Sequence, residues 1–286
     1  MNLLTILQTR KNNEYTVEQA GEKNLNFWNH LEELRKTFLR MICAVILFTI
    51  GAFCFKEQLF DIILAPQNNR FWTYRLFESI SQALHISGMG ADEFQIHLIN
   101  TQLSGQFLMH MNLSLYAGII LSSPYLIYQL FHFISPALYT KERTYSLRAI
   151  LWGYTLFIMG VLFCYFIVFP FALRFLALYQ VSPEVANTIT IQSYTETLCT
   201  LSILSGITFE IPILAWVLAK TGLLTASFMK KYRRHAIIIT LIIAAIITPT
   251  SDAITLLLTS LPMLVLYEIS IRIVGRNEAK TPKHLN

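Results

Sequence analysis

The chain has 286 residues, of which 54% are hydrophobic and only 14% are charged. Soluble domains carry about 25% charged residues, so this composition excludes an ordinary soluble domain and indicates a membrane protein. The formal net charge of +5 would also suit a nucleic-acid-binding protein, and the distribution of the bases along the chain decides between the two.

The chain begins with a polar stretch over residues 1–26, which we expect to be a flexible tail. In residues 26–40, apolar side chains recur at near-helical spacing. They are Phe27, Leu31, Leu34 and Phe38. This pattern predicts an amphipathic helix at the membrane surface that continues directly into a first membrane span at about 37–55.

Later apolar runs predict five more spans. They lie at about 108–130, 149–173, 198–219, 236–249 and 253–271. The fifth, as a helix of roughly 21 Å, is shorter than a hydrocarbon core of about 30 Å. A tight turn at 250–252 joins it to the sixth, so we expect a hairpin of two spans that thins the bilayer or tilts its neighbours.

Residues 57–107 form the only sizeable predicted extracytoplasmic region. Within it, the pattern of apolar and aromatic residues over 70–84 predicts a short helix lying at the outer membrane interface.

The bases predict the orientation of the chain. With a cytoplasmic N-terminus, eighteen of the 22 Lys and Arg residues fall in cytoplasmic segments. The other four are Lys56, Arg70, Arg75 and Arg174. Because cytoplasmic loops are enriched in bases, we predict an all-α membrane protein with six transmembrane helices and with N- and C-termini cytoplasmic. The membrane domain is expected over 27–272 and a cytoplasmic tail over 273–286. The topology explains the basic charge, so no nucleic-acid partner is expected.

Motifs for enzymatic chemistry are not found in the sequence. It contains no GxxxxGK[ST] phosphate loop, no HExxH motif and no GxSxG elbow. The four cysteines lie in or beside apolar runs without CxxC spacing, and the histidines are scattered. We therefore expect neither an enzyme nor a bound metal or cofactor.

The most informative residue within a span is Glu210, which lies 12 residues into the predicted fourth span, roughly 18 Å deep. A carboxylate near the middle of a bilayer costs about 2.5 kcal/mol or more, so it is expected to have a function. The alternative is a protonated acid hydrogen-bonded to a neighbouring helix. Pro212 leaves one carbonyl of the preceding turn without a donor, which would offer Glu210 a local partner.

Two further acids lie at the predicted cytoplasmic surface beside bases. Glu142 lies between Lys141 and Arg143, in a turn that Pro136 separates from the second span, and Glu33 precedes Arg35. Each could be an ordinary surface charge that balances its neighbours. Alternatively, two separated carboxylates on one face could each bind a guanidinium group in a bidentate geometry. The residues alone do not choose between these interpretations.

Several motifs together resemble the TatC family of twin-arginine protein translocases. The run His30-Leu31-Glu32-Glu33-Leu34-Arg35 is similar to the family pattern HLxELR. In chain order, the other matching motifs are Ala65-Pro66, Phe133 with Pro136-Ala137-Leu138-Tyr139 and Glu142-Arg143, Phe209-Glu210-Ile211-Pro212, Thr248-Pro249 with Asp252, and Pro262 with Leu266-Tyr267-Glu268. The resemblance covers about residues 27–272 and includes the six-span topology.

The resemblance implies a subunit of the bacterial cytoplasmic (inner) membrane that helps to export folded proteins, powered by the proton gradient. It also implies recognition of signal peptides that carry an Arg-Arg pair. By this resemblance, the signal-peptide-binding residues match Glu33, Glu142, Phe133, Gln129 and Arg35, the membrane groove residues match Glu210 and Pro212, and structural positions match Pro66, Pro136, Pro249, Asp252 and Pro262. Besides the lipid bilayer, the implied partners are single-span TatA-type and TatB-type proteins and further copies of the chain in a homo-oligomeric receptor complex.

Two departures from the family pattern are visible. The outer region 57–107 is longer than expected, so the resemblance assigns no role to 67–100. The turn after the fifth span reads Thr248-Pro249-Thr250-Ser251-Asp252, where Thr-Pro-Pro-Asp is the common form, and a glutamine common in the early sixth span is absent.

Two other functions remain as alternatives. A proton-coupled small-molecule transporter would use Glu210 as its proton carrier, and a paired ionisable group at similar depth would favour it. A purely structural membrane scaffold would make Glu33, Glu142 and Glu210 individually dispensable.

The base distribution yields a labelling test of topology. In a variant without the native cysteines, single cysteines at positions 90, 185 and 251 should react with an impermeant maleimide added to intact cells. Cysteines at 141, 228 and 280 should react only after the membrane is opened. Labelling of position 141 from outside would contradict the predicted orientation, because the turn that contains Glu142 would then face the wrong compartment.

Overall fold

The computed structural model describes residues 31–68, 71–83, 97–134, 143–179, 182, 188–248 and 253–280. The helices, in chain order, are Leu31–Cys54, α2 (Lys56–Leu64), the 3-10 helix η1 (Ala65–Gln67), α3 (Trp72–Ala83), α4 (Gly105–Ile134), α5 (Arg143–Phe163), the π-helix η4 (Cys164–Val168), α6 (Phe169–Leu178), α7 (Ile191–Phe209), α8 (Ile211–Lys220), α9 (Ala226–Lys231), α10 (Arg233–Ile247) and α11 (Ala253–Lys280). Two short strands, β1 (Leu98–Ile99) and β2 (Ile189–Thr190), form a parallel ladder.

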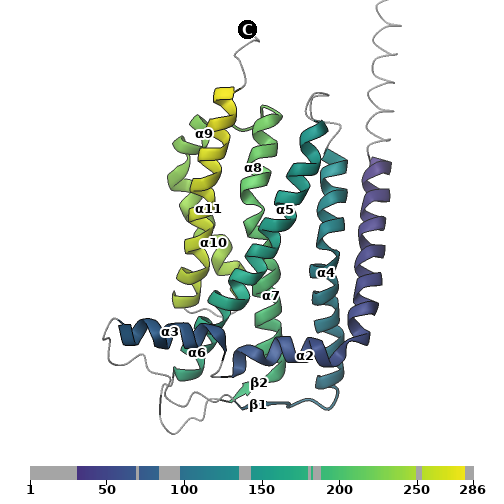
Figure 1. Cartoon of the computed structure of the whole chain (residues 1–286), viewed down its shortest axis with the longest axis vertical. Helices are drawn as coiled ribbons and strands as arrows, with labels where there is room; N and C mark the ends of the chain where they lie inside the picture. Colours follow the sequence, from purple (N-terminus) through teal and green to yellow (C-terminus); the bar gives the residue numbers. More distant parts are fainter. Residues whose placement is uncertain are drawn as a thin grey trace, which may run out of the picture.

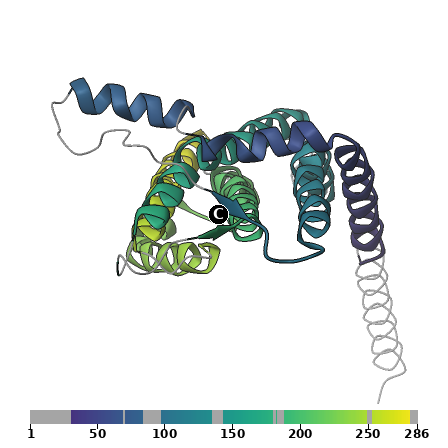
Figure 2. The same cartoon turned by 90° about the horizontal axis from the view of Figure 1, so that it is seen from below.

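The long helices run side by side between the two ends of the molecule, and α2 and α3 lie across one end (Figures 1 and 2). The helix Leu31–Cys54 begins, and α11 ends, at the opposite end. Among the described residues, five helical stretches are long and apolar enough to cross a membrane. The predicted fifth span corresponds to α10, which has only 15 residues and is not among these five. The all-α membrane fold predicted from the sequence is therefore confirmed.

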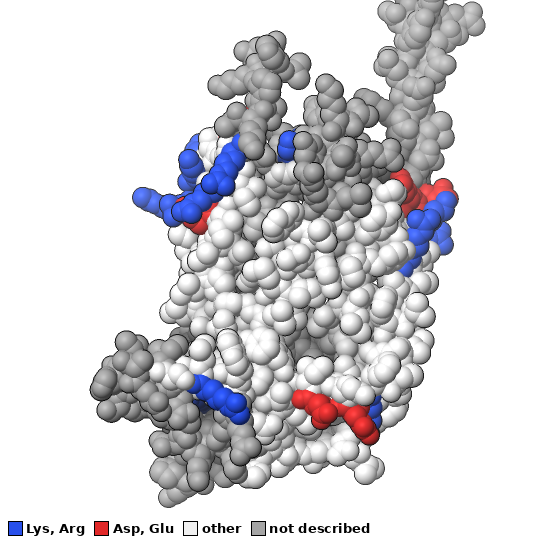
Figure 3. Space-filling view, viewed as in Figure 1, with Lys and Arg blue, Asp and Glu red and all other residues white. Residues whose placement is uncertain are grey.

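Charged side chains gather towards the two ends of the molecule and leave an uncharged band between them (Figure 3). Large apolar side chains are exposed in the spans of this band, for example Ile46, Leu47 and Ile50 on the first described helix. In water such a surface would cost free energy, whereas lipid tails are as apolar as these side chains. The surface thus agrees with a protein immersed in a bilayer.

Glycines allow the spans to approach one another closely. Gly160 of α5 and Gly206 of α7 pack together, and a Cβ atom on Gly160 would lie only 2.7 Å from the carbonyl oxygen of Ser205. The Ser205 hydroxyl donates a hydrogen bond of 2.9 Å back to the Gly160 carbonyl. On the other side of the bundle, a Cβ on Gly118 of α4 would lie 2.8 Å from the backbone nitrogen of Thr49. Small residues at such contacts are typical of helix packing in membranes.

Pro124 lies inside α4 and removes the backbone donor that would otherwise bond the carbonyl of Ile120. The hydroxyl of Ser123 donates a 2.7 Å hydrogen bond to that carbonyl. In hydrocarbon no water can replace the missing donor. The serine beside the proline therefore allows α4 to continue as one helix.

Pro170, at the start of α6, has the same effect on the carbonyl of Phe166 within the π-helix η4. Here the donor comes from outside the span, because the hydroxyl of Thr73 on α3 bonds to the carbonyl oxygen of Phe166. The hydroxyl of Tyr74 donates to the carbonyl of Pro66 over 3.1 Å. Burial raises the pKa of Tyr74 well above its ordinary value, so this hydroxyl stays protonated. The Thr73 bond fixes α3 against the outer end of the third span, and the Tyr74 bond fixes it against η1.

Tyrosine hydroxyls also hold the last turn of α2. Tyr165 donates to the carbonyl of Ile62 (2.6 Å) and Tyr194 donates to the carbonyl of Ile63 (2.8 Å). The last carbonyls of a helix have no partner within the helix. Two spans, the third and the fourth, thus satisfy them and fix α2 across the outer end of the bundle.

The helices differ from the apolar runs of the sequence in three places. The third span is interrupted by η4, and the fourth is interrupted at Glu210, between α7 and α8. The sixth extends to Lys280, beyond the last apolar residues. Hydropathy marks the part of a helix that lies in lipid, so it detects neither local changes in helical winding nor extension into water. The predicted turn at 250–252 lies outside the described residues.

The contact between α5 and α7 yields a stability test. Gly160→Ala should lower the free energy of unfolding by about 1–3 kcal/mol, because the new methyl group meets backbone atoms that cannot move without separating the helices. The measurement is thermal or denaturant unfolding of the purified chain in detergent. Gly51→Ala is the matched control, since nothing lies within 4 Å of its Cβ position. Equal stability of the two variants would contradict the inferred packing.

Candidate functional site

Glu210 occupies the interruption between α7 and α8. Its backbone nitrogen donates to the carbonyl of Ile207 (3.1 Å), and its own carbonyl accepts from Ile213 and Leu214. Pro212 stands in the first turn of α8, where its missing donor is tolerated. Counting ten residues to the end of α8, Glu210 lies roughly 15 Å from the inner end of this helix. This depth is near the middle of a hydrocarbon core of about 30 Å.

The carboxylate of Glu210 lies over Gly153 of α5. A Cβ atom on Gly153 would lie 3.3 Å from Oε2 of Glu210 and 3.2 Å from Cγ2 of Ile127 on α4. Oε1 of Glu210 is buried and has no hydrogen-bond partner among the described residues. The local partner that Pro212 was expected to create is therefore not seen for this oxygen within the described part of the chain. Oε1 of Glu210 is thus a hydrogen-bonding atom near the middle of the membrane that has no partner in the described part of the chain.

A second available polar atom belongs to Gln129 of α4, which is only 5% exposed. Its Nε2 donates to the hydroxyl of Tyr125 over 2.6 Å, while its Oε1 is buried without a partner among the described residues. Phe133 follows four residues later and is half-buried. Buried apolar side chains join α4, α5 and α8 around this region, namely Ile127, Phe131, Ala149, Phe157, Ile213 and Val217.

The acid predicted on the first helix, Glu33, lies at its exposed beginning. A pocket of about 370 Å³ is lined by Glu32, Glu33, Lys36, Thr37 and Arg40. Lys36 forms an ion pair of 2.8 Å with Glu32. Among the described residues, no cation lies within 4 Å of the Glu33 carboxylate. The surface-charge interpretation would require a neighbouring base to neutralise Glu33. Lys36 does not do so, because it pairs with Glu32.

The remaining predicted positions are distributed as follows. Arg35 is exposed on the first helix. Pro66 is buried in η1, where its carbonyl accepts the bond from Tyr74. Pro262 lies inside α11 and lines a small cavity of about 10 Å³. Four predicted positions lie outside the described residues: Glu142, Pro136, Pro249 and Asp252.

Sequence reasoning missed two residues that build this site, Gly153 and Tyr125. Gly153 has no side chain, and this leaves room for the Glu210 carboxylate beside it. The hydroxyl of Tyr125 accepts a hydrogen bond from the Gln129 amide. A glycine inside an apolar run is a usable signal, because it marks a close approach in a membrane helix. Tyr125 could have been found from its spacing, since residues i and i+4 share a helix face.

These features define a class, a multi-span helical membrane protein. Between its spans lie buried polar atoms that have no hydrogen-bond partner among the described residues. At one membrane surface lies an acid that has no cation partner among the described residues. A family model described as Sec-independent protein translocase protein (TatC) matches residues 29–262. The chain therefore belongs to the TatC family.

Individual relatives agree with this assignment. The TatC protein of Blattabacterium sp. is 39% identical over 257 residues, which cover 88% of this chain and 96% of the relative. That of Desulforapulum autotrophicum is 33% identical and covers 90% and 88%, respectively. A crystal structure of the twin arginine translocase receptor TatC has 32% identity and a TM-score of 0.68, covering 86% of this chain and 97% of the other. A second structure, in DDM, has a TM-score of 0.70.

The comparisons establish the general role of the chain. It is a component of the Sec-independent protein translocase, an integral protein of the cytoplasmic membrane that works with other components of that system. They also confirm the predicted six-span helical fold.

Proposed function

We propose that this chain binds Arg-Arg signal peptides at its cytoplasmic face and nucleates the export of folded proteins, driven by the proton gradient. The observation that carries the proposal is the likeness, over 86% of the chain, to a solved structure described as the twin arginine translocase receptor. The acid Glu33, without a cation partner among the described residues, supports it from the chain itself.

A twin-arginine signal offers two guanidinium groups followed by an apolar stretch. Each guanidinium can donate two parallel hydrogen bonds to a carboxylate, and this bidentate geometry adds strength and selectivity. In the proposal, Glu33 binds one guanidinium and Glu142 the other, and Arg35 helps to position the Glu33 region. The ion pair between Lys36 and Glu32 supports this role for Glu33, because it occupies the nearby base that would otherwise compete.

The apolar part of the signal would then lie along α4, past Phe133 and Gln129. Gln129 is buried, and its side-chain oxygen has no partner among the described residues, so it can accept a hydrogen bond from a backbone group of the signal. Phe133 provides apolar surface at the cytoplasmic end of the same helix face.

Glu210 would hold a polar group of a partner helix in the middle of the membrane. The partner classes are the TatA-type and TatB-type single-span proteins, and the receptor complex would be a homo-oligomer of this chain. The buried Oε1 of Glu210, which has no partner within the described part of the chain, supports such a contact, since hydrogen bonds between spans meet no competition from water.

The alternative of a proton-coupled small-molecule transporter has less support. It calls for a second ionisable group beside Glu210. The buried His110 lies near the outer end of α4, where its ring stacks on Phe53 with centroids 4.1 Å apart. That position differs in depth from Glu210, which lies near the middle of its span, so the two do not form a relay.

The first test concerns the recognition of arginine. Glu33→Ala or Glu142→Ala should each weaken the binding of an Arg-Arg signal peptide about 10-fold, because a charge-assisted hydrogen bond contributes about 1.5–3 kcal/mol and both sites face water. The affinity should fall with rising salt, and Arg→Lys in the signal should also weaken binding. The measurement is equilibrium binding of a labelled signal peptide to the purified chain.

The matched control is Glu32→Ala, which removes a neighbouring carboxylate that Lys36 already neutralises. It should change the affinity much less than Glu33→Ala. Unchanged binding to the double variant Glu33→Ala, Glu142→Ala would refute the assignment.

The second test concerns Glu210. If hydrogen bonding is its role, Glu210→Gln should retain much of the crosslinking to a TatA-type helix, because an amide still donates and accepts, and Glu210→Ala should lose it. If proton transfer is its role, both variants should stop export and leave assembly intact. The measurement is site-specific crosslinking beside an export assay. Normal crosslinking and normal export in Glu210→Ala would show that the residue is only structural.

A further inference from the structure

A group of bases lies at the cytoplasmic ends of α9 and α10, away from the site described above (Figures 1 and 3). No acid occurs in the sequence between Glu210 and Asp252, so any compensation for these bases must come from another element. The group falls within residues 230–234, and its members are all exposed. They are Lys230, Lys231, Arg233 and Arg234.

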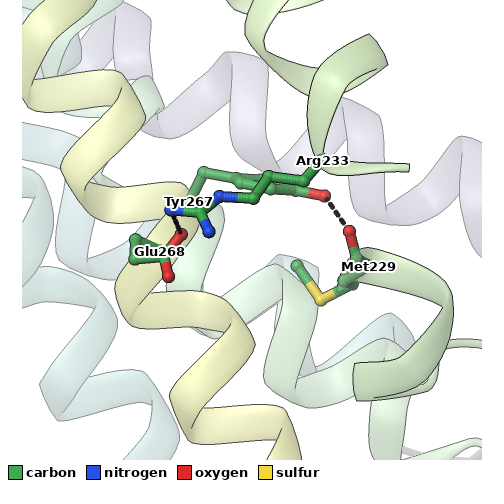
Figure 4. Close-up of polar contacts among 4 residues, drawn as sticks. All are labelled: Met229, Arg233, Tyr267 and Glu268. Atoms are coloured by element: carbon green, nitrogen blue, oxygen red, sulfur yellow. Dashed lines mark hydrogen bonds and ion pairs between the residues drawn. The ribbon is translucent and has the colours of Figure 1, made fainter. Parts of the chain in front are cut away.

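The neighbouring acids of α11 are already engaged. Glu268 forms an ion pair of 3.0 Å with Arg233 (Figure 4). Glu278 accepts a 2.7 Å hydrogen bond from the backbone nitrogen of Ala226, at the start of α9. Of the four bases, Arg233 is therefore the one that α11 neutralises.

We call the other three bases the basic ridge. Among the described residues, no carboxylate lies within 4 Å of any of them. The basic ridge consists of Lys230, Lys231 and Arg234.

The basic ridge stands on a fixed support. The hydroxyl of Tyr267 donates a 3.0 Å hydrogen bond to the carbonyl of Met229 (Figure 4). Met229 and Ala226 of α9 are buried against Val274 of α11. Because α9 is held to α11 by these contacts, the backbone that carries Lys230 and Lys231 is in place without a ligand, which lowers the cost of ordering on binding.

Aromatic side chains lie beside the ridge. Phe228 and Tyr232 are both exposed, with ring centroids 4.6 Å apart. The ammonium group of Lys231 lies 5.8 Å from the centroid of the Tyr232 ring. Exposed tyrosine and other aromatic rings beside bases are typical of the level of lipid headgroups.

Beyond Arg234, α10 presents aliphatic side chains to the surroundings. With 15 residues, α10 is roughly 22 Å long and shorter than a hydrocarbon core of about 30 Å. A short span thins the bilayer around it, and this draws headgroups towards the ridge. The exposed isoleucines of α10 are Ile237, Ile238, Ile239, Ile242, Ile243 and Ile246.

We propose that the basic ridge binds the phosphate of an anionic phospholipid of the cytoplasmic leaflet, with its acyl chains along the isoleucines of α10. Bases and aromatic rings gather at the cytoplasmic end of α10, and aliphatic side chains follow along the helix, which matches the polar head and the acyl chains of a lipid. Anionic lipids of the cytoplasmic leaflet attract basic segments beside a span. A soluble acidic protein would match the bases but would leave the isoleucines uncovered.

The test compares lipid binding by matched variants of the full chain, purified in a zwitterionic detergent. Phosphatidylglycerol is titrated in, and bound lipid is counted by native mass spectrometry, with phosphatidylcholine as the neutral lipid. Lys231→Gln, Arg234→Gln should weaken phosphatidylglycerol binding roughly 25-fold, about fivefold for each base. The control Lys56→Gln, Arg75→Gln removes two exposed bases from the opposite end and should bind phosphatidylglycerol as the unchanged chain does.

Further measurements distinguish a lipid site from a site for free phosphate, from a folding defect and from a protein-docking surface. Glycerol phosphate should not displace the lipid at equal concentration, because it lacks acyl chains. Lys231→Arg, Arg234→Lys keeps both charges and should restore binding, which separates a lipid site from a folding defect. Equal losses in the ridge and control variants, or displacement by glycerol phosphate, would overturn the proposal. So would unchanged lipid binding in the ridge variant together with loss of signal-peptide or TatA-type binding, since the ridge would then be a protein-docking surface.

Discussion

The need to satisfy backbone carbonyls inside hydrocarbon governs how this bundle is built. Each proline within a span removes one donor, and lipid cannot replace it. At Pro124 the neighbouring Ser123 supplies the donor from the same helix, so α4 stays whole. At Pro170 the donor is Thr73 of α3, so the repair of one span also attaches the outer helix. The carbonyl that Pro170 leaves without a backbone donor thereby becomes a contact between α3 and the third span.

Pro212 has a different outcome, and the candidate functional site lies there. The Thr208 carbonyl that this proline frees is approached by the backbone N–H of Glu210 rather than by a side chain, and the helix is interrupted at Glu210. The interruption directs a carboxylate over Gly153, where its Oε1 is buried without a partner among the described residues. Unsatisfied polar atoms are costly in hydrocarbon, so this arrangement fits a contact that another helix completes.

The two ends of the molecule are built for different purposes. At the outer end, hydroxyls of Tyr74, Tyr165 and Tyr194 donate to carbonyls of α2 and η1, which holds that end rigidly together. At the cytoplasmic end, Glu33 and the basic ridge have no partners of opposite charge among the described residues. Rigid support on one side and uncompensated charges on the other suit a receptor that binds its ligands from the cytoplasm.

The sequence by itself determined the number and order of the spans, because hydropathy and charge reflect the solvent that each segment meets. On the same ground it singled out the acids at the cytoplasmic surface, Glu33 and Glu142. Glu210 could be singled out on the same ground, as a carboxylate within an apolar run. The roles of all the predicted site residues remain predictions, and Glu142, Pro136, Pro249 and Asp252 also lie outside the described residues. Only the tertiary structure decided the break at Glu210, the place of Gly153 beneath it, and which acid Lys36 neutralises. These depend on which helix faces meet and on distances of a few ångströms between side chains, which no local pattern encodes.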